Sequence, residues 1–376
     1  MERLVIIRTS AFVAAIILAF APPGVHASPA SAHPLVVAHS IDLSGPNGSI
    51  GRDYVAGITT GFDSINLKGG INGRKVTYIV RDDHGLPAET AANVSALIKD
   101  EHADYLLGPL GSDATNAVIA APVFVNSGHI LFAPLGDSSA TPGLRAMFWR
   151  PGIESEYLYL LTYFGNLGIK DVGIALQDTP QNVGAFRYLS REIAKRGMTL
   201  SGVARITAST AVMHLEALAL SRAKPKLVIA IADTIGSAQF LRAFRTSAPS
   251  TYVAGTSLTN LTTLREIAGV NAANWSVFSQ VVPDPAQTSS ALQAEHLKMM
   301  KLLRDEPVSS VTLEGFAVAK TLATMIQQGS GPGKSPLAGK APLEVGGMTI
   351  GALGRGNNLS RYVGIALLKQ GGGLLF

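Results

Sequence analysis

The chain has 376 residues, of which 47% are hydrophobic and 15% are charged, and its formal net charge is +5. This length and composition exclude a disordered chain and predict two or three globular domains with large cores. The positive charges form no cluster interleaved with aromatic residues, so nucleic acid is not expected as a partner.

The first 27 residues have the composition of a secretory signal peptide. Arg3 and Arg8 form a positive start, residues 11–21 an apolar core, and residues 25–27 a small-residue cleavage site before Ser28. An uncleaved N-terminal anchor is the alternative, but the apolar stretch is shorter than the ~20 residues that cross a membrane. The chain has no cysteine, which excludes disulfides and a lipid-attachment thiol. We therefore expect a soluble periplasmic protein, cleaved near Ala27, that is not a lipoprotein.

The first half of the chain alternates apolar runs with amphipathic stretches. The pattern predicts strands at residues 35–41, 75–81, 105–107 and 129–133, and helices at residues 51–67, 88–99 and 114–125. This alternation is typical of a parallel sheet covered by helices on both faces. Ligands of such sheets bind beyond the carboxyl ends of the strands, where we expect the loops that hold Asn47, Ser112 and Asp137.

The same alternation starts again after residue 170. Strands are predicted at 171–176, 200–206, 227–232, 252–254 and 275–281, and helices at 183–195, 211–222, 235–245 and 261–267. Two long helices follow, at 290–304 and 311–328, and then a hairpin of 345–352 with 362–369. We expect an α/β protein whose first lobe is 33–150 plus 286–328 and whose second lobe is 152–279 plus 343–376. The crossovers are expected near Pro151, 280–285 and 329–342, where proline and glycine collect.

The turn at residues 108–112 is the first candidate binding element. Ser112 stands just ahead of a predicted helix, where serine is a favoured N-cap. The start of a helix carries free N–H groups and a partial positive charge, which suit a carboxylate or phosphate. Gly111 would let such a ligand approach the backbone closely. An ordinary turn with a helix cap remains the alternative.

No sequence motif supports catalysis or metal binding. Residues 329–335 have the wrong glycine spacing for a phosphate loop, and no serine has the spacing of a nucleophile elbow. Asp82, Asp83 and His84 follow a strand and precede a Gly-Leu-Pro sequence, where carboxylates usually stabilise turns. We expect no enzymatic activity, no metal and no cofactor.

Five short motifs, in order, resemble one family. They are IDLSGP at 41–46, NLKGGINGR at 66–74, two aspartates at 82–83, LGPLGS at 107–112 and EGFAVAK at 314–320. Together they resemble the periplasmic solute-binding proteins of ABC transporters that bind leucine, isoleucine and valine. The resemblance covers nearly the whole mature chain. It implies two Rossmann-like three-layer lobes joined by a three-stranded hinge, the type I periplasmic binding fold, which closes around its ligand.

The resemblance also implies roles for residues of the first lobe. Ser112, with Gly111, matches the position that holds the ligand carboxylate. Leu135, followed by Gly136, matches a residue that contacts the ligand through its backbone. Asp137 falls where amino-acid binders usually carry a threonine that contacts the polar end of the ligand.

In the second lobe the chain departs from the family pattern. Asp233 stands where a tyrosine is usual, and Thr256 where a glutamate usually pairs with the ligand ammonium. A pocket aromatic is expected near Gln181 or Asn182, and neither is aromatic. A buried ammonium needs an acidic partner. Either Asp137 or Asp233 supplies it, or the ligand is not an α-amino acid. Both could instead be turn residues, since Asp137 precedes two serines and Asp233 could equally cap the helix that follows.

The sequence thus predicts a binding protein. We expect a monomeric receptor that captures a small polar ligand, an amino acid or a related carboxylate or amide, and delivers it to a membrane ABC permease. The alternative is a receptor of the same fold that acts in a signalling complex. An enzyme acting in the cleft lacks any recognisable pair of nucleophile and base.

Overall fold

The computed structural model describes residues 33–136, 145–329, 342–351, 358–369 and 374–376. The predicted signal peptide and the candidate site residue Asp137 lie outside these ranges. Within them, no helix is both long enough and apolar enough to span a bilayer.

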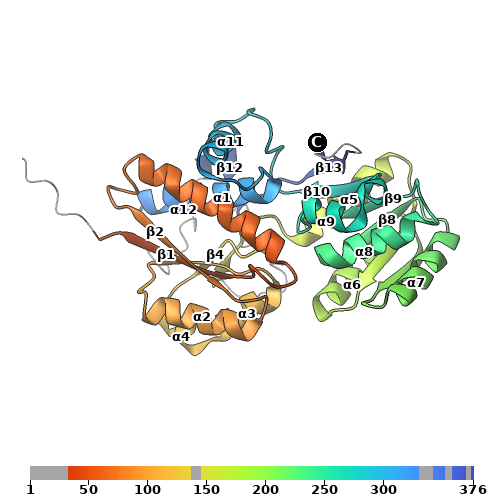
Figure 1. Ribbon diagram of the computed structural model, residues 1–376, viewed down its shortest axis with the longest axis horizontal. Coiled ribbons are helices and arrows are strands. Elements are labelled where there is room, and N and C mark those ends of the chain that lie inside the picture. The colour runs from red at the N-terminus through yellow and green to blue at the C-terminus, as the bar shows by residue number, and fades with distance from the viewer. Residues whose placement is uncertain (1–32, 137–144, 330–341, 352–357, 370–373) are drawn as a thin grey trace, which may run out of the picture. The chain divides into compact units, whose positions relative to one another are not determined.

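The first sheet has five parallel strands in the order β2-β1-β3-β4-β5. The strands are β1 Leu35–Ile41, β2 Val76–Asp82, β3 Tyr105–Leu107, β4 Leu131–Phe132 and β5 Ala146–Met147. The connecting helices are α1 Gly48–Leu67, α2 Pro87–Lys99, α3 Ser112–Ala120 and α4 Pro122–Ser127. In Figure 1, α1 covers one face of this sheet and α2 to α4 cover the other. Neighbouring residues of β1 accordingly join different cores, Val37 with α1 and Ala38 with α2.

The second sheet has seven strands in the order β14-β13-β10-β9-β8-β6-β7. Five are parallel: β6 Asp171–Gln177, β7 Thr199–Ile206, β8 Leu227–Ile231, β9 Tyr252–Gly255 and β10 Ser276–Gln280. The helices are α5 Ile153–Asn166, α6 Pro180–Lys195, α7 Thr210–Arg222, α8 Thr234–Arg245, α9 Leu261–Ala268 and α10 Val270–Ala273. Separate cores lie on its two faces, one with α5 and α6 and one with α7 to α9. The predicted two-lobed α/β fold is confirmed.

The C-terminal hairpin predicted from the sequence is wrong. β13 Gly364–Leu368 pairs antiparallel with β10 and with β14 Leu374–Leu375, not with the preceding apolar run. That run instead forms the small hairpin of β11 Leu343–Val345 and β12 Met348–Ile350. Two glycines between these strands, Gly346 and Gly347, have positive φ and permit the tight turn.

The β11–β12 hairpin belongs to the core of the first sheet, together with α11 Ala291–Leu303 and α12 Ser310–Gln327. Leu343, Ile350 and Leu359 are buried in that core. The sequence-based division gave all of 343–376 to the second lobe, and from this shared core we propose that the described residues of 343–360 belong to the first lobe. We propose that the third crossover follows Ser360, whose N–H still donates to Trp149 O.

Two helices depart from the sequence expectation for local reasons. The predicted helix at 114–125 is broken into α3 and α4 at Ala121, because Pro122 lacks an N–H and forces the preceding residue into an extended conformation. Helix α5 was not predicted at all, although its apolar spacing (Tyr157, Leu160, Leu161, Phe164) is typical of a helix with one buried face.

Helices α1 and α12 pack so closely that glycine is required at the contact. A Cβ on Gly57 would lie 2.0 Å from Thr312 O, and one on Gly315 would lie 2.3 Å from Tyr54 O. A Cβ on Gly61 would lie 2.6 Å from the Ala319 Cβ. This contact holds α1, and with it the loop that carries Asn47, against the C-terminal part of the chain.

Candidate functional site

A cavity of about 490 Å³ is lined by residues from both lobes. Its walls are the loops at the carboxyl ends of the strands, the starts of α1, α3 and α5, the N-cap of α8, and the part of α6 from Pro180 to Arg191. This is the position in which α/β sheets bind ligands. We refer to it as the interlobe pocket.

The interlobe pocket brings together nine of the ten candidate site residues. They are Asn47, Gly111, Ser112, Leu135, Gly136, Gln181, Asn182, Asp233 and Thr256. The tenth, Asp137, lies outside the described residues. That these nine residues bind a ligand stays a prediction.

The start of α3 differs from the sequence expectation in one detail. The N-cap is Gly111, with φ 99°, and Ser112 is the first residue of the helix rather than its cap. Gly111 has no side chain that could accept a hydrogen bond from the first turn. By contrast, α6 is capped by Thr179, which accepts from Asn182 N, and α8 by Asp233, which accepts from Gly236 N. The start of α3, like those of α1 and α5 in the same pocket, has no side-chain cap, and helix starts of this kind suit an anionic group.

Buried aromatic side chains of the first lobe hold the two loops that carry Ser112 and Gly136 by hydrogen bonds to the loop carbonyl oxygens. His39 Nε2 lies 2.8 Å from Gly108 O, and His39 Nδ1 lies 2.7 Å from the Tyr78 hydroxyl. Burial lowers the pKa of His39 to about 4, so the ring is neutral at pH 7. Because a carbonyl only accepts, Nε2 carries the proton and Nδ1 accepts from Tyr78.

The second loop is held in a strained conformation. Ala133 has φ 57°, a value that a residue with a side chain rarely adopts, and its carbonyl accepts a hydrogen bond of 3.0 Å from the buried Tyr54 hydroxyl. The loop passes so close to the first one that a Cβ on Gly108 would lie 2.5 Å from the Pro134 Cβ. These contacts place Leu135 and Gly136 next to the start of α3.

Gly136 and Ser112 lie in direct contact. A Cβ on Gly136 would be 3.3 Å from Ser112 N and 3.4 Å from Ser112 Oγ. The missing side chain thus leaves room beside Ser112 that a larger residue at position 136 would fill.

The predicted backbone contact of Leu135 is limited by bonds within the protein. Its N–H donates to Pro109 O at 3.0 Å, and its carbonyl accepts from Gly111 N at 2.8 Å. Only the second lone pair of this carbonyl is left for a ligand.

Asp233 caps α8, one of the two roles considered for it. Its Oδ1 accepts from Gly236 N at 2.7 Å, and its Oδ2 accepts from Gln177 Nε2 at 2.8 Å. Gln177 Oε1 accepts in return from Asp233 N. The carboxylate still lines the interlobe pocket, so a ligand contact stays compatible with the cap.

The pocket also contains residues that sequence reasoning missed. Among its described lining residues, the acids are Asp233 and Glu154, the one cation is Arg191, and the aromatic side chains are Tyr157 and Tyr188. Glu154 and Tyr157 belong to α5, so recognising that helix from its apolar spacing would have revealed them. Tyr188 lies one to two turns beyond Gln181 and Asn182, where the resemblance implied an aromatic residue. Burial, followed by the charge of Glu154, raises the pKa of Tyr188.

The aspartates at the end of β2 stabilise the turn, as the sequence predicts. Asp82 accepts from Leu43 N and from Ser44 Oγ, and Asp83 accepts from Ser40 Oγ and Thr90 Oγ1. Across the part of the chain that the structure describes, no group of three or more histidine or acidic side chains is placed to hold a metal ion.

Comparison with known families and structures gives a consistent result. The family described as "Periplasmic binding protein" matches residues 34–355. A substrate-binding periplasmic protein from Ralstonia solanacearum superposes with a TM-score of 0.81, covering 91% of this chain and 99% of that one at 24% identity. At this identity the likeness shows the fold.

Curated relatives match over shorter stretches. The chemotactic signal transduction system substrate-binding protein BasB of Halobacterium salinarum is 33% identical over 87 residues, 23% of this chain and 21% of that protein. The Leu/Ile/Val-binding protein homolog 4 of Brucella abortus is 40% identical over 74 residues, 20% of this chain and 18% of that protein. The aligned stretches thus span only about a fifth of the length of these relatives.

Proposed function

The chain belongs to the periplasmic binding protein family and is a ligand-binding receptor rather than an enzyme, and from this premise we propose its cargo and its destination. The proposed cargo is a small polar solute, an amino acid or a related carboxylate or amide. The proposed destination is a membrane ABC permease, and the proposed setting is the periplasm, with the receptor acting as a monomer.

The start of α3 carries this proposal. Its first turn faces the interlobe pocket, its N-cap Gly111 has no side chain, and a side chain at Gly136 would lie against Ser112. The backbone dipoles at a helix start give it a partial positive charge, which attracts carboxylates and phosphates. We propose that the anionic group of the ligand sits here, between Ser112 and Gly136.

The acidic residues that the second lobe contributes to the pocket indicate that the ligand also carries a positively charged or hydrogen-bonding group. Asp233 and Glu154 line the pocket, whereas the position of the usual glutamate holds Thr256. Because an ammonium in a closed pocket requires an acidic partner, we propose that these two carboxylates take over that role.

A sensor function is the second candidate. One relative is named a chemotactic substrate-binding protein, and another is named for leucine, isoleucine and valine. Both functions use the same closure around a ligand, which favours the closed state by its differential affinity for it.

A thermal-shift screen tests the ligand class. The panel contains branched-chain and other amino acids, amides, aromatic acids and short carboxylates, and a ligand that binds only the folded protein raises the melting temperature with its concentration. Gly136→Ala should weaken the binding of any hit at least ~10-fold, which is about 1.4 kcal/mol. Gly184→Ala is the matched control, because its Cβ would meet nothing within 4 Å in the same pocket. Equal binding by wild type and Gly136→Ala would contradict the proposed anion position.

A strain from which the gene for this protein is deleted distinguishes delivery to a permease from signalling through a sensor. If the protein serves a permease, the strain loses uptake of the radiolabelled hit and keeps its other responses to that compound. If it serves a sensor, uptake is unchanged and movement or gene expression in response to the hit is lost.

A further inference from the structure

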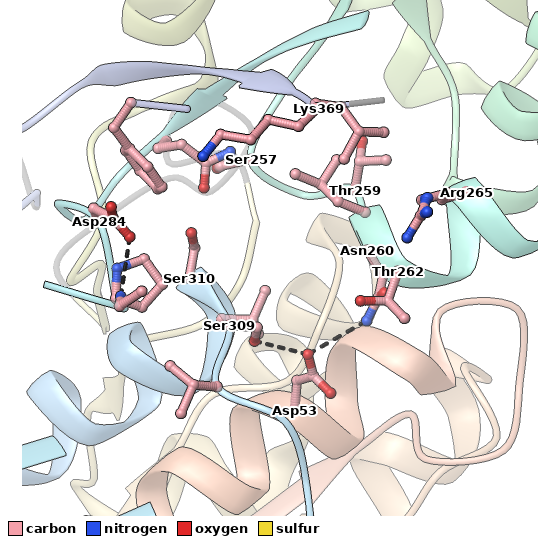
Figure 2. A pocket seen from close by; sticks show the side chains of 18 of the residues that line it. Asp53, Ser257, Thr259, Asn260, Thr262, Arg265, Asp284, Ser309, Ser310 and Lys369 are labelled. Atoms are coloured by element: carbon pink, nitrogen blue, oxygen red, sulfur yellow. Dashed lines mark hydrogen bonds between the residues drawn. The ribbon is translucent and has the colours of Figure 1, made fainter. Parts of the chain in front are cut away.

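A second, larger cavity of about 760 Å³ lies apart from the interlobe pocket. Its lining shares no residue with that of the interlobe pocket. It is formed by the segment after β9, the start of α9, the segment before α12, and Asp53 of α1 (Figure 2). We refer to it as the second cavity.

One segment of the chain forms a wall of both cavities. Thr256 and Leu258 line the interlobe pocket, whereas Ser257, Thr259 and Asn260 line the second cavity. The Ser257 N–H is fixed from behind by Glu156, whose Oε2 accepts at 2.8 Å. The side chain of Ser257, only 7% exposed, is thereby held on the side of the second cavity.

The second cavity contains hydrogen-bond donors that have no acceptor. Within the described residues, the Ser257 hydroxyl, the Ser310 hydroxyl and Arg265 Nε are shielded from water and without a hydrogen-bond partner. Buried donors of this kind are rare, because leaving one unpaired costs about 1–3 kcal/mol. Figure 2 shows the Ser310 hydroxyl directed toward the space between these side chains, the Lys369 side chain running along the upper rim toward Ser257, and Arg265 on the side of α9.

The two cationic side chains that line this cavity, Arg265 and Lys369, have no acidic partner among the described residues, whereas two of its three acidic side chains accept hydrogen bonds from the protein. Neither Arg265 nor Lys369 forms an ion pair with any described residue. Asp53 accepts from Ser309 Oγ at 2.8 Å and from Asn260 Nδ2 at 3.4 Å, and Asp284 accepts from Ala286 N at 3.0 Å. The third acid, Glu266, is exposed. The lining thus has three acids and two cations, and what it lacks is an acceptor for the unpaired donors and a partner for Arg265 and Lys369.

We propose that the second cavity is a binding site for a small organic carboxylate, separate from the interlobe pocket. One carboxylate of the molecule pairs with the guanidinium of Arg265, and a second carboxylate or a hydroxyl of the same molecule meets the ammonium of Lys369 on the opposite side of the cavity. The hydroxyls of Ser257 and Ser310 donate to the first carboxylate or to a hydroxyl or second carboxylate on the same molecule. Arginine suits this role because its planar group meets both oxygens of a carboxylate at once.

Isothermal titration of the purified protein with citrate, malate and succinate tests the proposal. At least one of the three should bind, and Arg265→Gln should weaken that binding at least ~10-fold. Lys369→Gln, a change at an exposed position, should weaken it ~3-fold or more and serves if Arg265→Gln does not fold. Arg222→Gln, which removes an exposed arginine from the last turn of α7, is the charge-matched control and should stay within ~2-fold of wild type.

Gly136→Ala shows which cavity the carboxylate occupies. The proposal expects Gly136→Ala to leave the binding of that carboxylate unchanged while it weakens binding of the interlobe ligand. Two results overturn the proposal. The first is that none of the three carboxylates binds at 10 millimolar, a concentration at which titration detects a Kd on the order of 1 mM. The second is that binding is lost in Gly136→Ala and kept in Arg265→Gln. The first result leaves the function proposed for the interlobe pocket untouched, because that function depends on Ser112 and not on Arg265. The second result would place the carboxylate in the interlobe pocket and would support that function, so the two proposals fail separately.

Discussion

Replacing Gly57 by alanine should loosen the contact between α1 and α12. The new Cβ would lie 2.0 Å from the Thr312 carbonyl oxygen, 1.4 Å short of an ordinary 3.4 Å contact. The neighbouring atom is backbone, so it cannot turn aside as a flexible side chain could, and the two helices must separate.

The expected loss follows from two opposing effects. Overpacking a well-filled core costs about 1–3 kcal/mol, and this contact belongs at the upper end because backbone must move. Alanine in a helix interior gains about 1 kcal/mol over glycine. The net loss is about 2 kcal/mol, and at ~2–4 °C per kcal/mol the melting temperature should fall by about 4–8 °C.

Thermal unfolding without ligand, followed by circular dichroism, measures this change. Gly184→Ala is the matched control: it makes the same substitution in a helix, α6, where the Cβ meets open space. It should raise the melting temperature by about 1–4 °C, since only the propensity gain of about 0.5–1 kcal/mol remains. If Gly57→Ala were as stable as Gly184→Ala, the close approach of α1 and α12 would be refuted.

Three further outcomes are expected. Glu314→Gln should cost about 3–5 kcal/mol in urea unfolding, because it leaves Arg150 charged without its partner; both side chains are 3% exposed or less, and their two bonds are 3.0 and 2.7 Å. The double change Arg150→Met with Glu314→Leu should recover most of that loss, and a fully stable single variant would contradict the argument. Burial lowers the pKa of His39 and of His296 to about 4, so the unfolded chain binds more protons between pH 6.5 and 4. The contribution of these two neutral histidines to stability is therefore complete above pH 6.5, and it falls by up to about 3 kcal/mol per histidine as the pH drops to 4. His39→Gln should make the melting temperature depend less on pH. Asp233→Ala should cost about 1 kcal/mol through the lost cap of α8, whereas Asp233→Asn keeps the cap; equal melting temperatures for these two variants would show that the cap contributes little.

The alternation of strands and helices could be read from the sequence because it depends on local periodicity. In β8, Leu227–Ile231, every residue is buried, as expected for a central parallel strand covered on both faces, and the sequence shows it as an unbroken apolar run. The clustering of Asn47 and Ser112 also followed from the sequence, since parallel strands of one sheet deliver their next loops to the same edge. Asp233 follows a strand of the second sheet, and only the family resemblance implied that it lies in the same pocket.

Which residue caps a helix depended on the backbone dihedral angles at its start, which the residue type alone does not specify. Ser112 is a good N-cap residue, yet Gly111 takes that position because only glycine tolerates its φ of 99° without strain. Helix α5 and its pocket residues Glu154 and Tyr157 were not predicted, although the helix has the apolar spacing of one buried face.

Only the tertiary structure decided which distant residues meet. Asp53, Asn260 and Ser309 are more than 200 residues apart at the extremes and form one hydrogen-bonded group, and the unpaired donors of Ser257, Ser310 and Arg265 line the same cavity. The pairing of β13 with β10 was decided in the same way. Periodic burial depends on neighbouring residues, so it can be predicted from the local sequence pattern. A cavity or a wall shared by two cavities depends on how distant segments pack, so no local pattern predicts it.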